Sequence, residues 1–227
     1  MKNVGTLLLC LASLLACRRG DVTPREPQDP DWIRLTIPAG GQVLSVTGNL
    51  DSTLYVSSTF TVYKTTDRGR SWQPVIARNS GPLGVYSRKD TVFLTQSVVT
   101  TGTERYLINV TNYSIDAGAS WLTDNRLRAD RGNVRTDLVK ASGGVAYAEK
   151  GNTTGSYVNP SAIIRRSSGG SGPLRFPYKH VINQLYLDAQ NRLYVAVRGR
   201  HLPETNRIWC CDQNEVGYVY VSRRALP

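Results

Sequence analysis

The chain has 227 residues, of which 40% are hydrophobic and 20% are charged, and its formal net charge is +11. These values fit one globular domain with a short extension, and they exclude collagen-like, coiled-coil and fully disordered chains. A domain of this size buries a sufficient hydrophobic core, so it needs no disulfide scaffold. Composition therefore limits the fold class but indicates no reaction.

Residues 1–16 have the pattern of an export signal, with a positive charge at Lys2 and an almost entirely apolar run over Val4–Ala16. At about 1.5 Å per residue this run spans roughly 20 Å, too short for a membrane-spanning helix, so we expect a signal sequence. It ends in Leu14-Leu15-Ala16-Cys17, which resembles the lipobox of bacterial lipoproteins. The resemblance implies cleavage before Cys17 and a lipid anchor on its sulfur, in the cell envelope. Plain secretion is the alternative.

Residues 17–31 contain three prolines, mixed charges and few apolar side chains. This composition is typical of a flexible tether between a lipidated Cys17 and a folded domain over 32–227.

Two cysteines remain in the predicted domain, the neighbours Cys210 and Cys211. Consecutive Cα atoms lie about 3.8 Å apart, closer than in ordinary disulfides, so we expect unlinked thiols, with a strained vicinal disulfide as the alternative. Besides this pair the chain offers only His180 and His201 as soft ligands. We therefore expect no metal site, and no motif indicates a cofactor.

An eight-residue pattern occurs twice, at Thr65–Trp72 and Ser114–Trp121. Both copies have Ser or Thr, then Asp, Gly, Ser and Trp at the same spacing. A third, eroded copy covers Ile163–Gly170, with Ser168 at the Asp position and Pro173 at the Trp position. The chain is thus built from repeats.

Paired runs of β-branched and aromatic residues accompany each repeat, joined by turn residues such as Lys89-Asp90 and Gly143-Gly144. No long stretch has apolar residues at helical spacing. The sequence therefore predicts an all-β chain of four units, each with three or four strands.

The repeated pattern resembles the Asp-box, or BNR repeat, of the sialidase-like β-propeller superfamily. The resemblance implies a propeller of about four blades, each with four antiparallel strands. In that family the box joins the third and fourth strands of a blade, away from the ligand face. We therefore assign structural roles to the box residues: Thr65, Asp67, Gly69, Trp72, Ser114, Asp116, Gly118 and Trp121.

The fourth unit lacks an outer strand, while Trp32–Ile37 resembles the strand that follows the first box. We expect this N-terminal segment to lie beside Gly217–Ser222 and to close the ring, which removes an exposed edge. The alternative is a fragment of a larger propeller that continues beyond Pro227.

If the ring forms, the connections between blades and the second-to-third connections share one face, rich in arginine. Long loops are predicted there at Val98–Arg105, Gly151–Pro160 and Arg198–Asn206, and loops on a rigid scaffold commonly bind ligands. The candidate ligand-binding residues are Arg105, Arg126, Arg128, Arg131, Arg135, Tyr157, Lys179, Arg198, Arg200 and His201. Since arginine pairs bidentately with carboxylate and phosphate, we expect an anionic glycan or an envelope protein as partner, and no nucleic acid.

Three functions stay open. We prefer a non-catalytic binding or scaffold lipoprotein attached to the membrane by its lipid. A sialidase-like glycoside hydrolase, or a truncated remnant of one, is disfavoured because none of the candidate acids belongs to a recognisable catalytic motif. These acids are Glu104, Asp124, Asp137 and Glu204. An assembly factor for a membrane complex is the third.

Overall fold

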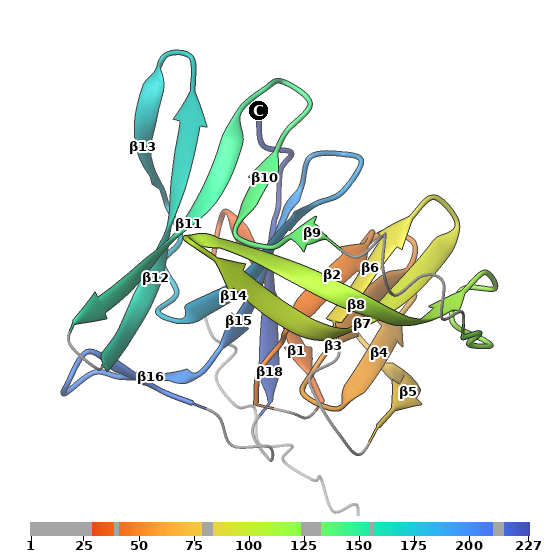
Figure 1. Cartoon of the computed structure of the whole chain (residues 1–227). Coiled ribbons are helices and arrows are strands. Elements are labelled where there is room, and N and C mark those ends of the chain that lie inside the picture. Colours follow the sequence, from red (N-terminus) through yellow and green to blue (C-terminus); the bar gives the residue numbers. More distant parts are fainter. Residues whose placement is uncertain (1–28, 39–40, 79–83, 124–132, 155–156, 211–215) are drawn as a thin grey trace, which may run out of the picture.

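The computed structural model describes residues 29–38, 41–78, 84–123, 133–154, 157–210 and 216–227. They form an all-β fold of four four-stranded antiparallel sheets and one two-stranded hairpin (Figure 1). In this part of the chain, no helix is long and apolar enough to cross a bilayer. The predicted leader and most of the predicted tether lie outside the described residues.

Three sheets consist of consecutive strands, and one combines the two ends of the described chain. Sheet 1 contains β2 (Ser45–Gly48), β3 (Leu54–Ser57), β4 (Thr61–Thr65) and β5 (Gln73–Ala77). Sheet 2 contains β6 (Gly84–Arg88), β7 (Thr91–Thr101), β8 (Glu104–Ser114) and β9 (Val134–Arg135). Sheet 3 contains β10 (Leu138–Lys140), β11 (Ala146–Thr154), β12 (Tyr157–Ser167) and β13 (Gly170–Leu174). Sheet 4 has the order β1 (Trp32–Ile37), β18 (Gly217–Ser222), β15 (Leu193–Arg198) and β14 (Val181–Leu187). The separate hairpin consists of β16 (Arg200–Leu202) and β17 (Arg207–Trp209).

The N-terminal strand pairs with the C-terminal strand in the predicted position. β1 is antiparallel to β18, with Trp32 opposite Ser222 and Ile37 opposite Gly217. Buried and exposed residues alternate along β1, so that Leu35 is buried and Arg34 is exposed. The pairing completes sheet 4 and places Arg34 next to the aromatic residues of β18.

The two intact boxes form loops with the same hydrogen bonds. The Ser71 amide donates to Oδ1 of Asp67 (2.9 Å), and the Ser71 hydroxyl donates to Oδ2 (2.6 Å). Ser120 repeats both bonds on Asp116 at 2.9 and 2.6 Å. These bonds to the ionised form lower the pKa of both aspartates to about 2, with the serine hydroxyl as the largest cause. Each carboxylate therefore binds its own loop at neutral pH.

Glycine is required in these loops because of both conformation and contact. Gly69 has φ +79°, and a Cβ there would lie 2.9 Å from Cδ2 of Leu35 in β1. Gly118 has φ +83°, and a Cβ there would contact Tyr55 of sheet 1. The first box loop, in sheet 1, thus packs against sheet 4, and the second box loop, in sheet 2, packs against sheet 1.

A tryptophan packs at each of three junctions between sheets. Trp72 joins the hydrophobic cluster between sheets 4 and 1, and Trp121 joins the cluster between sheets 1 and 2. The Trp121 indole N–H donates to the carbonyl of Val75 in β5 (3.2 Å). Trp32 occupies the matching place between sheets 3 and 4, where its indole N–H donates to the carbonyl of Arg175 (3.0 Å). Trp32 therefore packs at this junction as the box tryptophans do at the other two.

The junction between sheets 2 and 3 is different because the third box is eroded. Ser167 and Gly170 close a tight β12–β13 turn there, and Pro173 lies within β13, paired with Ile164. Instead of tryptophan packing, polar bonds span the gap. Arg105 of β8 donates to Oε2 of Glu149 in β11 (3.3 Å), and its amide donates to Oδ1 of Asp137 in the connection between the two sheets (2.9 Å).

The long segments predicted as loops are largely strands. Residues 98–101 and 104–105 extend the β7–β8 hairpin, and β11, β12 and β16–β17 take up much of the other two segments. Alternating β-branched residues such as Val98 and Thr100 allow this extension, which satisfies the backbone hydrogen bonds. After the second box, Leu122 forms an isolated bridge to Tyr113, and β9 pairs with β8 farther along the sheet.

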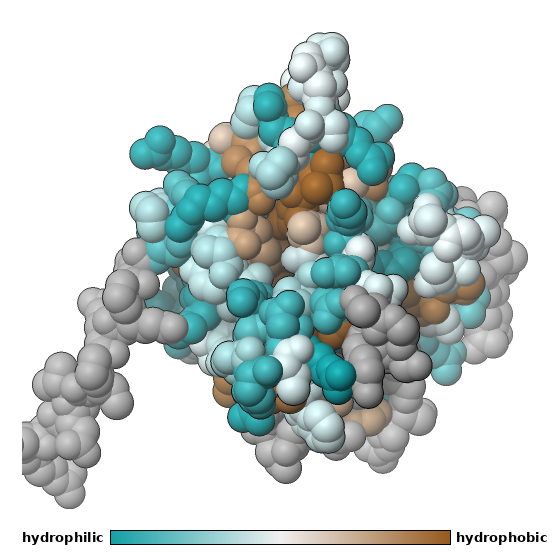
Figure 2. Space-filling view, turned by 90° about the vertical axis from the view of Figure 1, so that its left-hand side faces the viewer, coloured by the Kyte–Doolittle hydropathy of each residue, from teal (hydrophilic) through white to brown (hydrophobic). Residues whose placement is uncertain are grey.

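The face seen in Figure 2 is mostly hydrophilic, with one hydrophobic patch below the protruding upper end and smaller patches elsewhere. Most large apolar side chains instead belong to three buried clusters between the sheets. The core is thus divided among the junctions.

Replacement of Trp32 by alanine tests the importance of the sheet 3–4 junction. Trp32 is 3% exposed, so we expect Trp32→Ala to lower the free energy of unfolding by about 3–5 kcal/mol. Urea denaturation followed by circular dichroism measures this value. Trp209 is 59% exposed, and Trp209→Ala is the matched control, with an expected change within about 0.5 kcal/mol. Equal effects of the two substitutions would contradict the assigned role of Trp32.

Candidate functional site

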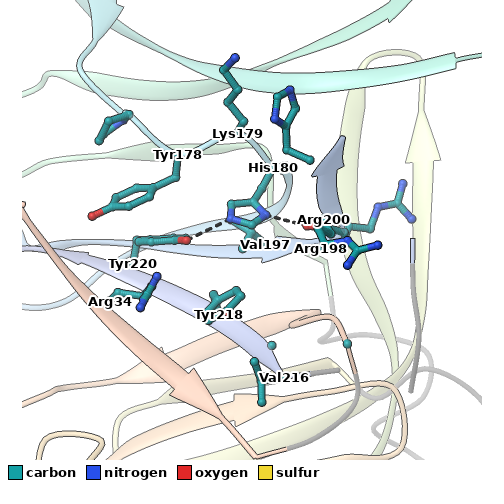
Figure 3. Close-up of a pocket in the computed structure, with 15 residues that line it drawn as sticks. Arg34, Tyr178, Lys179, His180, Val197, Arg198, Arg200, Val216, Tyr218 and Tyr220 are labelled. Carbon is teal, nitrogen blue, oxygen red and sulfur yellow. Dashed lines mark hydrogen bonds between the residues drawn. The ribbon is translucent and has the colours of Figure 1, made fainter. Parts of the chain in front are cut away.

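A pocket of about 680 Å³ lies between sheet 4, the segment that connects sheets 3 and 4, and the β16–β17 hairpin (Figure 3). This volume is in the usual range for sites that hold small organic ligands. The lining comes from Arg34 of β1, from Val197 and Arg198 of β15, and from Val216, Gly217, Tyr218 and Tyr220 in and next to β18. The remaining lining residues are Gly41, Pro177, Tyr178, Lys179, His180, Gly199, Arg200 and His201.

Four side chains with fixed positive charge line the pocket: Arg34, Lys179, Arg198 and Arg200. Among the described residues, no aspartate or glutamate is part of the lining. Arg34, Lys179 and Arg200 are exposed, whereas Arg198 is half-buried. The pocket therefore attracts negative charge from its mouth inward.

His180 is held in one tautomer at the wall of the pocket. Its Nδ1 lies 2.7 Å from the carbonyl oxygen of Gly199, and its Nε2 lies 3.0 Å from the hydroxyl of Tyr220 (Figure 3). Because a carbonyl only accepts, Nδ1 donates to Gly199 and Nε2 accepts from Tyr220. Burial lowers the pKa of His180, and Arg34 and His201 lower it further. The ring is therefore neutral at neutral pH.

An aromatic wall faces these charges. Tyr178 stacks on Tyr220 with ring centroids 3.9 Å apart, and Phe176 contacts both rings edge-on. Cζ of Arg34 lies 5.4 Å from the ring centroid of Tyr218, which is a cation–π contact. Rigid aromatic faces beside cations suit a ligand that has both a ring and a negative charge.

Arg198 differs from the other cations of the pocket. Its Nε is buried and has no hydrogen-bond partner among the described residues. Burial lowers the pKa of its guanidinium, and the nearby charge of Arg105 lowers it further. A buried donor without a partner costs about 1–3 kcal/mol.

The structure brings together only part of the predicted basic face. Lys179, Arg198, Arg200 and His201 line the pocket. Arg126, Arg128 and Arg131 lie outside the described residues, as does the side chain of Tyr157, whose backbone begins β12.

The side chains of Arg105 and Arg135 do not face the pocket but form hydrogen bonds with other residues of the protein. Arg105 donates to the carbonyl of Ile182 (2.9 Å) and to Oε2 of Glu149 (3.3 Å). Arg135 donates to Asp137 (2.9 Å) and to Glu104 (2.6 Å). Arg105 thus joins sheet 2 to sheets 3 and 4, whereas Arg135 binds within sheet 2 and to the connection that follows it. Neither arginine lines the pocket.

Two of the candidate acids belong to the same network. Burial raises the pKa of Asp137, but hydrogen bonds from Arg135 and from the Arg105 amide outweigh it and lower the pKa overall. Glu104 accepts from Arg135 and from the hydroxyl of Tyr106. Asp137 is therefore ionised and unsuited to act as a general acid. Glu204 is exposed in the β16–β17 turn, and Asp124 lies outside the described residues.

Cys210 forms a disulfide bond, contrary to the expected free thiols. Every other cysteine lies outside the described residues. In the described part of the chain no three metal-ligating side chains cluster.

Sequence reasoning missed Arg34, Tyr178, Tyr218 and Tyr220. The signal for three of them was present, because the predicted pairing of Trp32–Ile37 with Gly217–Ser222 places Arg34 opposite Tyr220. Tyr178 comes from an irregular segment, which has no periodicity to interpret.

No protein-family model matches this chain, and no curated protein matches it. A structure of YCF48 bound to D1 peptide is 13% identical, with coverage of 76% of this chain and 68% of that chain and a TM-score of 0.28. A nidogen/laminin complex is 14% identical, with coverage of 72% and 69% and a TM-score of 0.33. The extracellular domain of the putative one component system BT4673 from B. thetaiotaomicron is 10% identical, with coverage of 82% and 30% and a TM-score of 0.28. All three TM-scores lie below 0.5, and the fold assignment rests on the strand pairing of this chain itself.

The neutral state of His180 has a testable consequence for pH dependence. His180 binds a proton more weakly in the folded protein than in the unfolded chain. The contribution of the neutral ring to the free energy of unfolding is therefore fully present above about pH 6.5 and falls as the pH drops below that value. We expect an NMR titration midpoint below 6.5 for His180. The measurement uses His201→Gln, which leaves one histidine.

Tyr220→Phe provides the matched comparison, because it removes the hydroxyl that donates to Nε2 of the neutral ring. The midpoint should rise in this variant. A midpoint at or above 6.5 in the parent protein would show that the ring is not held neutral.

Proposed function

We propose that this protein is a lipid-anchored envelope protein whose domain binds an anionic glycan, without turnover, in the basic and aromatic pocket. The observation that supports this best is a lining with four fixed positive charges and, among the described residues, no carboxylate. Arginine and lysine at an open pocket attract anions, and the half-buried rings of Tyr178 and Tyr218 can pack against a sugar ring.

The anchor rests on the sequence Leu14-Leu15-Ala16-Cys17. With a lipid on Cys17 and a tether up to residue 31, the domain would remain near a membrane surface. Envelope polysaccharides with carboxylate or phosphate groups are then the anions within reach.

We also propose that the four sheets are the blades of a four-bladed propeller, closed by β1 on β18. The matching tryptophan contacts at three junctions support this arrangement. The pocket then lies where the last blade meets the connection from the blade before it.

Binding without hydrolysis agrees best with the chemistry of the lining. Most glycosidases place two carboxyl groups on either side of the scissile bond, and sialidases use a tyrosine as the nucleophile. The described lining supplies cations and phenols but no carboxyl group to act as the acid, so it can hold an anionic sugar without the acid that hydrolysis needs.

Binding to immobilised polysaccharides tests the proposal. We expect retention on polygalacturonate or on a phosphorylated mannan, none on neutral mannan, and a steep loss as NaCl rises, because salt screens exposed charges. The double variant Lys179→Glu, Arg200→Glu should weaken binding about tenfold or more, which is about 1.4 kcal/mol. Both residues are exposed, so the fold should tolerate the change.

The matched control is Arg70→Glu, Arg88→Glu, which changes the charge equally at exposed positions outside the pocket. Its affinity should stay close to that of the parent protein. Equal loss in both double variants would reduce the effect to net charge, and retention on neither polyanion would refute the function.

A further inference from the structure

We propose that the face of the domain opposite the pocket is a membrane-docking surface, which lies on a bilayer of anionic phospholipid and turns the pocket away from it. This inference rests on the lipid anchor of the proposed function and adds the orientation of the domain. The observations that carry it are an exposed apolar loop, the place where the N-terminal chain enters the fold, and the charges on the same face.

The direction of the strands divides the domain into two faces. β15 starts at Leu193 and ends at Arg198, which lines the pocket. The β14–β15 turn is therefore at the end of sheet 4 that points away from the pocket. The corresponding turns of the other sheets and the two box loops belong to the same end. Together they are called the turn face, and they cover residues 49–53, 66–72, 89–90, 115–121, 141–145 and 188–192.

Side-chain contacts connect these segments into one surface. Arg192 of the β14–β15 turn pairs with Asp51 of the β2–β3 turn (2.7 Å). Asp51 also pairs with Arg68 of the first box loop (2.9 Å). Lys64, next to the first box, donates to the carbonyl of Ala117 in the second box loop (3.2 Å). The turn face therefore extends without a break from sheet 4 to sheet 2.

The second box loop exposes apolar side chains where the first exposes polar ones. The two loops have the same hydrogen bonds and matching backbones, with φ of 63° at Arg68 and 56° at Ala117. The variable positions, all exposed, are Thr66, Arg68, Arg70 and Gln73 in the first loop and Ile115, Ala117, Ala119 and Leu122 in the second. Ile115 is 64% exposed and Leu122 is 44% exposed. Because the bonds to Asp116 fix the loop, these side chains stay in contact with water unless a partner covers them.

The N-terminal chain enters the fold at the turn face. The carboxylate of Asp29 accepts from both terminal nitrogens of Arg175 (3.1 and 3.0 Å), and its carbonyl accepts from Nε of Arg223 (3.0 Å). Arg223 follows Ser222, whose hydroxyl accepts from the amide of Leu193 directly after the β14–β15 turn (2.9 Å). The point at which the predicted tether joins the domain is thus fixed at the face that carries the apolar loop.

The length of the tether favours this face over the pocket face. Cys17 and Asp29 are twelve residues apart. A flexible chain of this length has an end-to-end distance of about 20 Å and a limit of roughly 40 Å. β1 alone, with six residues, extends about 20 Å from the turn face toward the pocket. With a lipid on Cys17, the turn face reaches the bilayer with a relaxed tether, whereas the pocket face requires a stretched one.

The charges of the turn face suit an anionic bilayer. Asp51 is paired with two arginines, and Asp67 and Asp116 are bound within their own loops. Among the described residues of this face, Asp90 is the exposed acid without such a partner. Exposed cations that pair with no acid in the same part of the chain are Arg70, Arg88, Lys89, Lys140 and Arg224. Cations near the surface attract anionic headgroups, and an apolar loop beside them can enter the interface.

Hydroxyl-radical footprinting of the full-length lipoprotein, isolated from membranes, tests the orientation. Oxidation rates are compared on nanodiscs of phosphatidylglycerol and on nanodiscs of phosphatidylcholine. We expect Ile115 and Leu122 to be oxidised about threefold more slowly on the anionic nanodiscs. Trp209, which is 59% exposed in the hairpin beside the pocket, should be oxidised equally on both. Equal rates at Ile115 on the two lipids, or a slower rate at Trp209 on the anionic one, would overturn the inference.

The double variant Ile115→Ser, Leu122→Ser tests the apolar loop. Both side chains are exposed, so the fold should tolerate the change. The protection of Lys89 on anionic nanodiscs should then fall to its value on neutral ones. The matched control is Val98→Ser, Val158→Ser, which removes side chains of 44% and 38% exposure from the other end of their sheets. It should leave Lys89 protected, and equal loss in both variants would contradict a specific role of the loop.

Failure of this inference can be told from failure of the glycan function. Retention on polyanions that depends on Lys179 and Arg200, together with equal footprints on the two lipids, would leave glycan binding and remove the docking face. A mass spectrum without lipid on Cys17 would remove the anchor and the docking face together. Slower oxidation of Ile115 without retention on any polyanion would support the docking face and refute glycan binding.

Discussion

The pairing of β1 with β18 is the interaction on which the fold and the pocket both depend. An antiparallel ladder from Trp32 to Ile37 joins segments from the two ends of the described chain. Without it, β18 would be an exposed edge of sheet 4, and unpaired edges invite aggregation. The same ladder brings Arg34 to Tyr218 and Tyr220, which line the pocket. One set of hydrogen bonds therefore completes a sheet and assembles a site.

Trp32 connects this ladder to the position of the functional side chains. Its indole bonds to the carbonyl of Arg175, and its ring contacts Phe176 edge-on at 5.2 Å. Phe176 in turn contacts Tyr220 and Tyr178, so the connection between sheets 3 and 4 is packed along its length. Lys179 and His180 follow immediately in sequence. The core of the sheet 3–4 junction thus sets the location of the pocket wall.

The junctions also show how a degraded repeat is tolerated. Where a tryptophan is present, apolar packing joins adjacent sheets, as Trp72 and Trp121 do. Between sheets 2 and 3, where the box is eroded, the ion pair of Arg105 with Glu149 does this instead. Buried ion pairs depend on good geometry to offset the loss of hydration. The arginines predicted to bind ligand are thus partly used as structural elements.

The strands, their turns and the terminal pairing were predictable because their signals are local: alternation, turn residues and a repeated motif. The role of each arginine was not, because it depends on which acids the fold brings near. Arg105 and Arg198 both lie near Glu149, yet Glu149 forms an ion pair with Arg105, whereas Arg198 lines the pocket. Nor could alternation show that residues 98–101 continue β7, since the same residues fit an exposed loop.

Native-state amide hydrogen exchange tests the central claim most directly. If the β1–β18 ladder holds the domain together, amides of β1 exchange only through the global unfolding that also exposes β15 in the middle of sheet 4. The two strands would then give equal free energies of opening. A much lower free energy of opening for β1, with the amides of β15 and β18 still protected, would show that the domain stays folded without the N-terminal strand. That result would contradict the account.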